Sequence, residues 1–200
     1  MTRITFNTVP LLGDLVLPAL MLAAEEFPRL QTTYRASLER VEITDPNLIV
    51  MRAGADKPGA GLVGHWLGRL GVGLVATQGY IARHGRPERP EDLARFSFAA
   101  HEWRTILPPW FRWVAQYVDE PHISFATDDE AAMRRAITSG RCAGFLPISS
   151  LIWTPELVEL YPQQEEWRAP LWLVHAEGAS QECRDITAYL GSIIQRSLAE

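Results

Sequence analysis

The segment Ile123–Pro147 constrains the fold more than any other part of the chain. It opens with alternating apolar and small residues, which predicts a strand, and continues into a helix whose apolar residues share one stripe. Gly140 is expected to end that helix in a left-handed conformation, and the apolar run after it predicts a second, more buried strand. Strand, helix and strand in this order form a crossover unit, which is typical of an open α/β sheet.

The start of the helix within this segment is a candidate ligand site. Thr127 is expected to cap the helix by accepting a hydrogen bond from the Glu130 backbone N–H, while the Glu130 side chain reaches back. Free amides and the positive end of the helix dipole favour an anion there, at the strand's carboxyl end where α/β proteins bind ligands. Such caps are common in crossover units, so this stretch taken alone favours a purely structural role.

Length and composition exclude several classes of protein. The 200 residues suffice for one large domain or two small lobes, and 47% hydrophobic residues can build a proper core. The formal net charge of −5 argues against a nucleic-acid-binding surface. No apolar span of transmembrane length and no secretion signal occurs. Cys142 and Cys183 lack CxxC spacing, so we expect two reduced thiols in a cytoplasmic protein.

Strand and helix patterns alternate along the rest of the chain. The expected strands are 3–7, 30–36, 48–51, 62–66, 70–75, 96–98 and 171–175. The expected helices are 17–27, 78–84, 148–160 with an interruption at Pro155, and 180–198. This alternation on both sides of a middle section predicts two α/β lobes joined by crossing strands.

Three segments resemble the effector-binding domain of LysR-type transcriptional regulators. Residues 67–87, LGRLGVGLVATQGYIARHGRP, and Pro90-Glu-Asp-Leu93 are similar to the family's run LG…VLVASPxYLxRHGxPxxPxDL. Thr127-Asp128-Asp129 and Gly144-Phe-Leu-Pro147 are similar to a second family segment. The third segment, Asn47-Leu-Ile-Val-Met-Arg52, stands where the family usually has Asp-Leu-Ala-Ile-Arg. Asn47 replaces the aspartate, so a charge near the end of a strand is missing. The resemblance covers nearly the whole chain.

The resemblance implies an α/β, two-lobed fold like that of the type II periplasmic binding proteins, with a small-molecule cleft between the lobes. Two crossing strands form the hinge in that fold, and we expect them at Leu70–Leu74 and around Trp167–Leu173. Lobe one would then comprise residues 1–72 and 168–200, and lobe two residues 73–167.

The resemblance also implies a function. A small metabolite, a carboxylate or an aromatic compound, would bind between the lobes and control DNA binding and transcription. The domain would form a homodimer or higher homo-oligomer, without a membrane partner. DNA would be contacted only through an N-terminal winged helix-turn-helix, which this sequence lacks, so we expect either a piece of a regulator or a stand-alone sensor. A type II solute-binding receptor and a stand-alone metabolite-binding protein are the alternatives.

Candidate ligand-binding residues follow the predicted strands of both lobes, because a ligand between lobes contacts the loops there. In lobe one they are Thr8, Val9, Pro10 and Leu11. Thr8 places a hydroxyl at the end of a strand and close to a helix start, where it could bind a ligand or serve only as a cap.

In lobe two the candidates are His101, Trp103, Thr127 and Asp128. His101 can donate or accept a hydrogen bond near neutral pH, although a solvated loop histidine also fits. Trp103 belongs to an aromatic concentration with Trp110 and Trp113, and such clusters usually form core, but an indole facing the cleft would favour a planar effector. The Asp128 carboxylate would repel an anion, so it either points away or favours a ligand with a donor or a positive charge.

Catalytic chemistry has little support in the sequence. The five histidines show no metal-binding spacing, and no GxSxG motif occurs. Ser149, Ser150 and Cys142 have no evident base partner. Gly59–Gly61 and Gly71–Gly73 lack the helix and spacing of a phosphate-binding loop. We therefore expect no catalytic residue, no metal and no cofactor.

Overall fold

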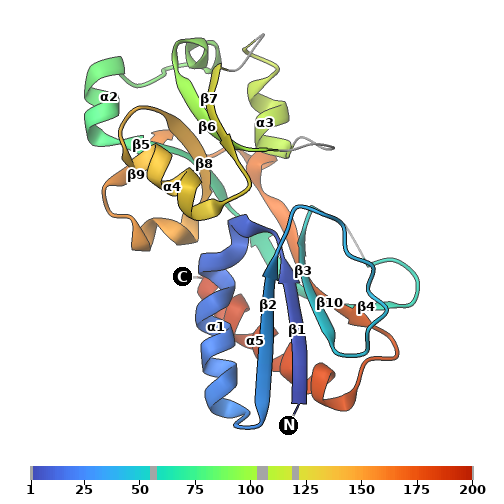
Figure 1. The fold of residues 1–200 in the computed structure, drawn as a ribbon. Helices are drawn as coiled ribbons and strands as arrows, with labels where there is room; N and C mark the ends of the chain where they lie inside the picture. Colours follow the sequence, from blue (N-terminus) through green and yellow to red (C-terminus); the bar gives the residue numbers. More distant parts are fainter. Residues whose placement is uncertain (1, 55–57, 103–107, 119–121, 200) are drawn as a thin grey trace. The chain divides into compact units, whose positions relative to one another are not determined.

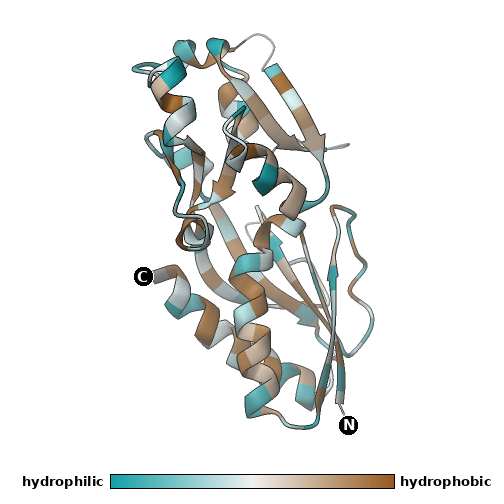
Figure 2. Cartoon of the chain, turned by 60° about the vertical axis from the view of Figure 1, so that its left-hand side comes forward, coloured by the Kyte–Doolittle hydropathy of each residue, from teal (hydrophilic) through white to brown (hydrophobic). Residues whose placement is uncertain are grey.

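Two compact units make up the computed structural model, Met1–Leu70 with Ala169–Glu200 (unit 1) and Gly71–Arg168 (unit 2). The structure describes residues 2–54, 58–102, 108–118 and 122–199 (Figure 1). Each unit contains one five-stranded sheet of mixed direction. The central strands of both sheets are largely hydrophobic (Figure 2), as expected for strands covered on both faces.

The sheet of unit 1 has the strand order β2-β1-β3-β10-β4. Its strands are β1 (Thr2–Thr8), β2 (Leu30–Ala36), β3 (Leu48–Ala53), β4 (Leu62–Leu70) and β10 (Ala169–Ala176). Strand β1 pairs in parallel with β2 and β3, whereas β10 pairs antiparallel with β3 and β4. Leu70 and Ala169 are register partners, so the chain leaves unit 1 and returns to it at neighbouring points of one sheet.

Helices α1 (Gly13–Glu26) and α5 (Gln181–Ala199) pack against each other and against this sheet. Helix α1 begins four residues before the predicted 17–27 helix, because Leu15 and Val16 are buried and extend its apolar stripe. On the sheet's other face, Ile43 packs with Leu48, Val50 and Val174. The irregular segment between β2 and β3 therefore contributes to the core as well.

The sheet of unit 2 has the strand order β7-β6-β8-β5-β9. Its strands are β5 (Val72–Thr77), β6 (Ser97–His101), β7 (His122–Thr127), β8 (Ala143–Pro147) and β9 (Leu157–Tyr161). Strand β6 pairs in parallel with β7 and β8, whereas β5 pairs antiparallel with β8 and β9. The predicted crossover unit is therefore present, with β6 lying between the two strands that the helix connects.

Helix α4 (Glu130–Thr138) packs on this sheet through Met133 and Ile137, and Gly140 follows it with a φ of +69° as predicted. A Cβ atom at Gly144 would lie 2.5 Å from Ile137 Cδ1, so the close approach of α4 to β8 depends on glycine. The unit also contains α2 (Gln78–His84) and α3 (Pro109–Val114).

An aromatic cluster forms a further part of the unit 2 core. Trp113 on α3 and Phe145 on β8 both meet Trp167 edge-to-face, with ring centroids 5.2 and 5.1 Å apart. Trp110 is also buried. The core interpretation of Trp110 and Trp113 is confirmed, because such pairs bury large rings in favourable geometry.

The helix predicted over residues 148–160 is wrong. Ile148–Trp153 forms a short 3₁₀ helix, η3, and Leu157–Tyr161 forms strand β9. Thr154 precedes Pro155 and has φ −143° and ψ 66°, outside the helical region, because proline disfavours helix at the residue before it. Pairing with β5 then fixes the strand, a contact that local sequence cannot show. The α/β class itself is confirmed.

Candidate functional site

In each sheet, three parallel strands bring their carboxyl ends to one edge. In unit 1 these strands are β1, β2 and β3, and in unit 2 they are β6, β7 and β8. Ligands of open α/β sheets bind at such edges, where loops and helix starts present backbone amides. The candidate residues of the sequence all lie at the end of β1, β6 or β7 or shortly after it.

Thr8 is the last residue of β1, and its side chain is 1% exposed. Its backbone oxygen accepts a hydrogen bond from Ser37 N at 2.9 Å. Its Oγ1 is buried and has no hydrogen-bond partner among the described residues. A buried polar atom left without a partner costs about 1–3 kcal/mol, which a ligand bonded to this hydroxyl would recover.

The residues after Thr8 turn the chain into a helix. Val9 is extended and its oxygen accepts the Leu12 N–H at 3.1 Å, opening the 3₁₀ helix η1 (Pro10–Leu12) that leads into α1. Neither helix start has a side-chain cap. Pro10 and Leu11 are buried, and because Pro10 has no N–H, the backbone donors after Thr8 belong to Val9 and Leu11.

In unit 2 the structure brings His101 and Thr127 side by side, since they are register partners on β6 and β7. The Glu102 N–H donates to the Thr127 carbonyl oxygen at 2.9 Å and continues this pairing. Thr127 is partly buried and Asp128 is exposed. The side chain of His101 and the whole of Trp103 lie outside the described residues.

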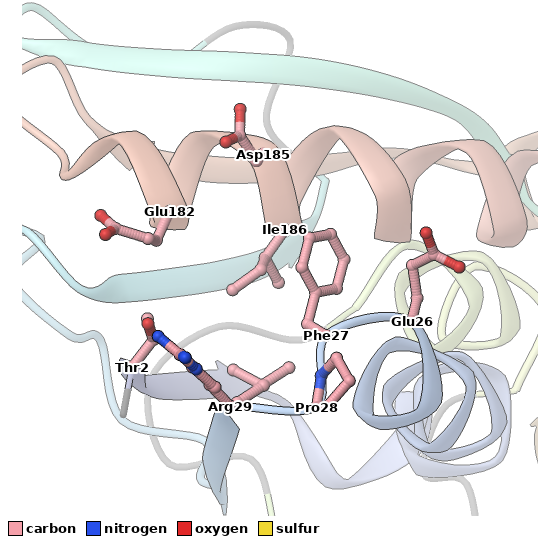
Figure 3. Close-up of a pocket in the computed structure, with 9 residues that line it drawn as sticks. Thr2, Glu26, Phe27, Pro28, Arg29, Glu182, Asp185 and Ile186 are labelled. Carbon is pink, nitrogen blue, oxygen red and sulfur yellow. The ribbon is translucent and has the colours of Figure 1, made fainter.

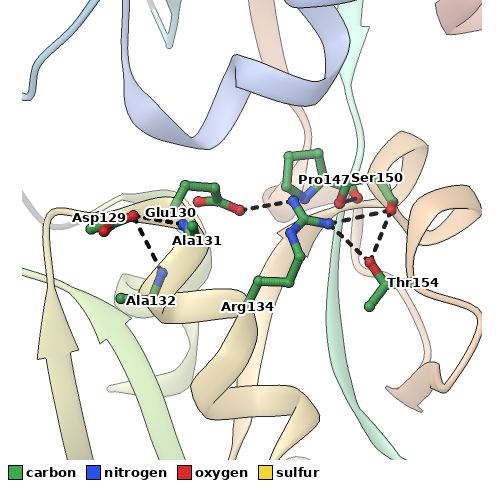
Figure 4. Close-up of polar contacts among 8 residues, drawn as sticks. All are labelled: Asp129, Glu130, Ala131, Ala132, Arg134, Pro147, Ser150 and Thr154. Carbon is green, nitrogen blue, oxygen red and sulfur yellow. Dashed lines mark hydrogen bonds and ion pairs between the residues drawn. The ribbon is translucent and has the colours of Figure 1, made fainter.

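The predicted capping box at Thr127 is wrong, because Asp129 caps α4 instead (Figure 4). Asp129 Oδ1 accepts the N–H groups of Ala131 and Ala132 at 2.8 and 3.3 Å. Thr127 Oγ1 accepts the Asp129 N–H at 3.0 Å. A carboxylate suits the positive helix end better than a hydroxyl does. Its charge occupies the position at which an anionic ligand was expected.

Glu130 does not reach back to the helix start. Its Oε1 lies 3.1 Å from Arg134 Nη2, and Arg134 Nη1 donates to Thr154 Oγ1 at 3.0 Å (Figure 4). Glu130 and Arg134 side chains are only 14% and 18% exposed. This partly buried pair therefore joins α4 to the end of η3, next to the edge that carries the candidate residues.

Ser149 is a further candidate for ligand binding, although its sequence context indicated only a nucleophile without a base partner. It follows β8 at the same edge as Thr127, since β6 is parallel to both β7 and β8. Its Oγ is buried and has no hydrogen-bond partner among the described residues. Its place just after the predicted strand that ends at Pro147 was the available signal.

Asn47, which stands where the LysR-type domains usually have Asp, makes a hydrogen bond within unit 1. Its Oδ1 accepts a hydrogen bond from Ser180 Oγ at 2.7 Å, and that Oγ accepts the Cys183 N–H at 3.1 Å. Asn47 therefore supports the start of α5, and it lies at the amino end of β3 rather than at the edge that carries Thr8.

A pocket of 340 Å³ lies elsewhere in unit 1, between the end of α1 and the start of α5 (Figure 3). It is lined by Thr2, Glu26, Phe27, Pro28, Arg29, Leu30, Glu182, Asp185 and Ile186. Thr2 and Leu30 are the first residues of β1 and β2. The pocket is therefore at the amino ends of these strands, opposite the edge that carries Thr8.

Neither thiol is activated for nucleophilic chemistry. Burial raises the pKa of Cys142, and it raises the pKa of Cys183 to about 11. In the described part of the chain, no group of three or more His, Cys, Asp or Glu residues could hold a metal ion. None of the helices described is both long enough and apolar enough to cross a bilayer.

The family model of the LysR substrate binding domain matches residues 2–190. The chain therefore belongs to this family, and the resemblance seen in the sequence is confirmed. The family consists of effector-binding domains with a regulatory role. A comparison with curated protein sequences gave no match.

Among the solved structures with the same fold are regulatory and effector-binding domains of other proteins. The CrgA regulatory domain from Neisseria meningitidis has a TM-score of 0.79 at 20% identity, covering 97% of this chain and 99% of that chain. The AphB regulatory domain from Vibrio vulnificus has a TM-score of 0.70 at 18% identity, covering 95% of this chain and 99% of that chain. The AmpR effector-binding domain from Citrobacter freundii has a TM-score of 0.71 at 15% identity, covering 98% of this chain and 100% of that chain. The predicted two-lobed fold class is confirmed.

Proposed function

We propose that this domain senses a small-molecule effector, which binds to the carboxyl edges of both sheets and thereby controls transcription. The observation that carries the proposal is the buried hydroxyl of Thr8, which has no partner among the described residues. From unit 1 the effector would contact Thr8, Val9, Pro10 and Leu11. From unit 2 it would contact His101, Trp103, Thr127, Asp128 and, in addition, Ser149.

The two edges favour different ends of the effector. The start of η1 and α1 has no side-chain cap, so a carboxylate could accept hydrogen bonds there together with the Thr8 hydroxyl. At the start of α4, the Asp129 carboxylate already accepts the first amides, and Asp128 is exposed beside it. We therefore propose a small carboxylate whose other end is aromatic or carries a hydrogen-bond donor.

Calorimetric titration with a library of small carboxylates and aromatic metabolites tests this proposal. Thr8→Val keeps the shape of the side chain but removes the hydroxyl, so we expect affinity to fall about tenfold. The stability of the free protein should hold or rise, because an unpaired buried oxygen is removed. Thr5→Val, on the same strand, is the matched control. Unchanged affinity in both Thr8→Val and Thr127→Ala would contradict the site.

We propose a homodimer as the assembled form of the domain. Helix α1 exposes Leu17 and Met21 by 41% and 60%, and the edge strand β7 exposes Ile123 and Phe125 by 50% and 40%. Apolar surfaces on a helix and an open sheet edge favour association. Sedimentation of Met21→Glu and Phe125→Glu should show monomers, whereas the control Ile152→Glu, at another exposed residue, should not.

Transcriptional control would be exerted in the cytoplasm through a winged helix-turn-helix outside this sequence. The acidic balance of the domain, with a formal net charge of −5, agrees with DNA contact by another domain. A fusion of this domain to the DNA-binding domain of a LysR-type regulator, assayed with that regulator's promoter, tests the proposal. Effector-dependent transcription is expected from the native domain and should be lost with Thr8→Val.

A further inference from the structure

His65 and His175 face each other on neighbouring antiparallel strands of unit 1. His65 lies on β4 and His175 on β10, and their Nε2 atoms are 3.4 Å apart. His175 is 1% exposed, whereas His65 is partly buried. Their separation of 110 residues in the sequence explains why motif spacing gave no sign of the pair.

A hydrogen bond fixes the tautomer of His175. Its Nδ1 lies 2.7 Å from the backbone oxygen of Ala176. A carbonyl oxygen can only accept, so Nδ1 carries the proton and the Nε2 of neutral His175 presents a lone pair to His65. Histidines that bind metals usually donate their other ring N–H to a carbonyl or carboxylate in this way, which orients the ring.

The distance between the two Nε2 atoms separates two interpretations. A direct hydrogen bond from nitrogen is normally about 2.7–3.2 Å long, so 3.4 Å would be a weak one. Two nitrogens bound about 2.0–2.1 Å from a tetrahedral ion lie about 3.3–3.4 Å apart. The observed spacing is therefore long for a direct bond and matches that of two ligands of one ion.

We propose that His65 and His175 bind a borderline transition-metal ion such as Zn²⁺ through their Nε2 atoms. Among the described residues no third His, Cys, Asp or Glu completes the set, so water would supply the other positions. Because Leu70 and Ala169 end β4 and begin β10, the ion would link the two strands through which the chain leaves and re-enters unit 1. This site is independent of the proposed effector site at Thr8.

Titration of the full chain with ZnCl₂ alone, after removal of adventitious metal by a chelator, tests the proposal. We expect saturable binding of one equivalent per chain and a rise in the midpoint of thermal unfolding, since the ion binds only the folded pair. His65→Asn should abolish both effects. His122→Asn, at an exposed histidine on β7, should change neither, and Mg²⁺ should not bind because it prefers oxygen ligands.

Histidine NMR resonances of the native chain give a second measurement that needs no variant. Zn²⁺ should shift the resonances of His65 and His175 and leave those of His84 and His122 unchanged. Absence of saturable binding, equal binding by His65→Asn, or shifts confined to His84 or His122 would each overturn the proposal.

Discussion

Two buried polar atoms support the proposed effector site at the level of single residues. Thr8 and Ser149 each bury a hydroxyl without a partner among the described residues, at the carboxyl edges of the two sheets. Thr8 could be named from the sequence because its place after a strand is a local property. The unpaired state of Ser149 and the meeting of His65 with His175 could not, since both depend on packing between distant segments.

Asp92 gives the stability of unit 2 a dependence on pH. Its Oδ2 accepts the N–H groups of Glu88 and Arg89 at 3.0 and 3.2 Å, and these bonds lower its pKa. Unfolded aspartate takes up protons at a higher pH, near about 3.9. The stabilisation is therefore present above that pH and is lost as the pH falls through the lower folded pKa.

Urea denaturation at several pH values between about 3 and 6 measures this effect. Asp92→Asn should reduce the loss of stability at acid pH relative to the native chain. Asp128→Asn, at an exposed carboxylate on the same unit, is the control and should follow the native profile. Parallel profiles for Asp92→Asn and the native chain would refute the assigned role of Asp92.

Among the elements, helices with clear starts and stops were predictable and the last strand of unit 2 was not. Helix α4 could be predicted from its apolar stripe and from Gly140, but the sequence did not show which of three consecutive polar residues caps it. Strand β9 was mistaken for helix because its identity comes from pairing with β5. Local patterns thus predict helices well, because their backbone hydrogen bonds join residues that are close in the sequence.

The cap of α4 should be measurable in the free energy of unfolding. Asp129→Ala removes both bonds to Ala131 and Ala132, so we expect a loss of about 1 kcal/mol. Asp128→Ala removes a neighbouring carboxylate without a capping role and should change stability little. Chemical denaturation followed by circular dichroism compares them, and an equal effect of both variants would argue against the assignment.

The close approach of α4 to β8 predicts that substitutions at Gly144 and Ile137 affect the free energy of unfolding non-additively. Gly144→Ala would place a methyl group 2.5 Å from Ile137 Cδ1, so we expect a loss of about 1–3 kcal/mol in unfolding free energy. Ile137→Val removes Cδ1 and should recover part of that loss in the double variant. A double-mutant cycle measures the coupling, and strictly additive effects would contradict the contact.

At the scale of the whole molecule, the two-lobed fold could be predicted from the resemblance to the LysR family, although the individual elements do not imply it. Strand order in either sheet could not be read from periodicity, which records only local alternation of apolar residues. The candidate site residues come from segments far apart in sequence, so residue types alone could not show which of these residues are neighbours in the fold.

Because Leu70 and Ala169 lie beside each other in one sheet, unit 2 is a continuous insertion into unit 1. A short glycine-serine turn joining these two residues should replace residues 71–168 and leave unit 1 able to fold. Circular dichroism and a single cooperative unfolding transition would show this, and a chain without cooperative unfolding would count against it.

The same adjacency suggests how this architecture can diversify. An inserted segment whose two ends emerge together can be lengthened, shortened or exchanged without disturbing the sheet that carries it. Recombination at this one junction would exchange all the residues that unit 2 contributes to the proposed effector site in a single event, and it would leave unit 1 unchanged.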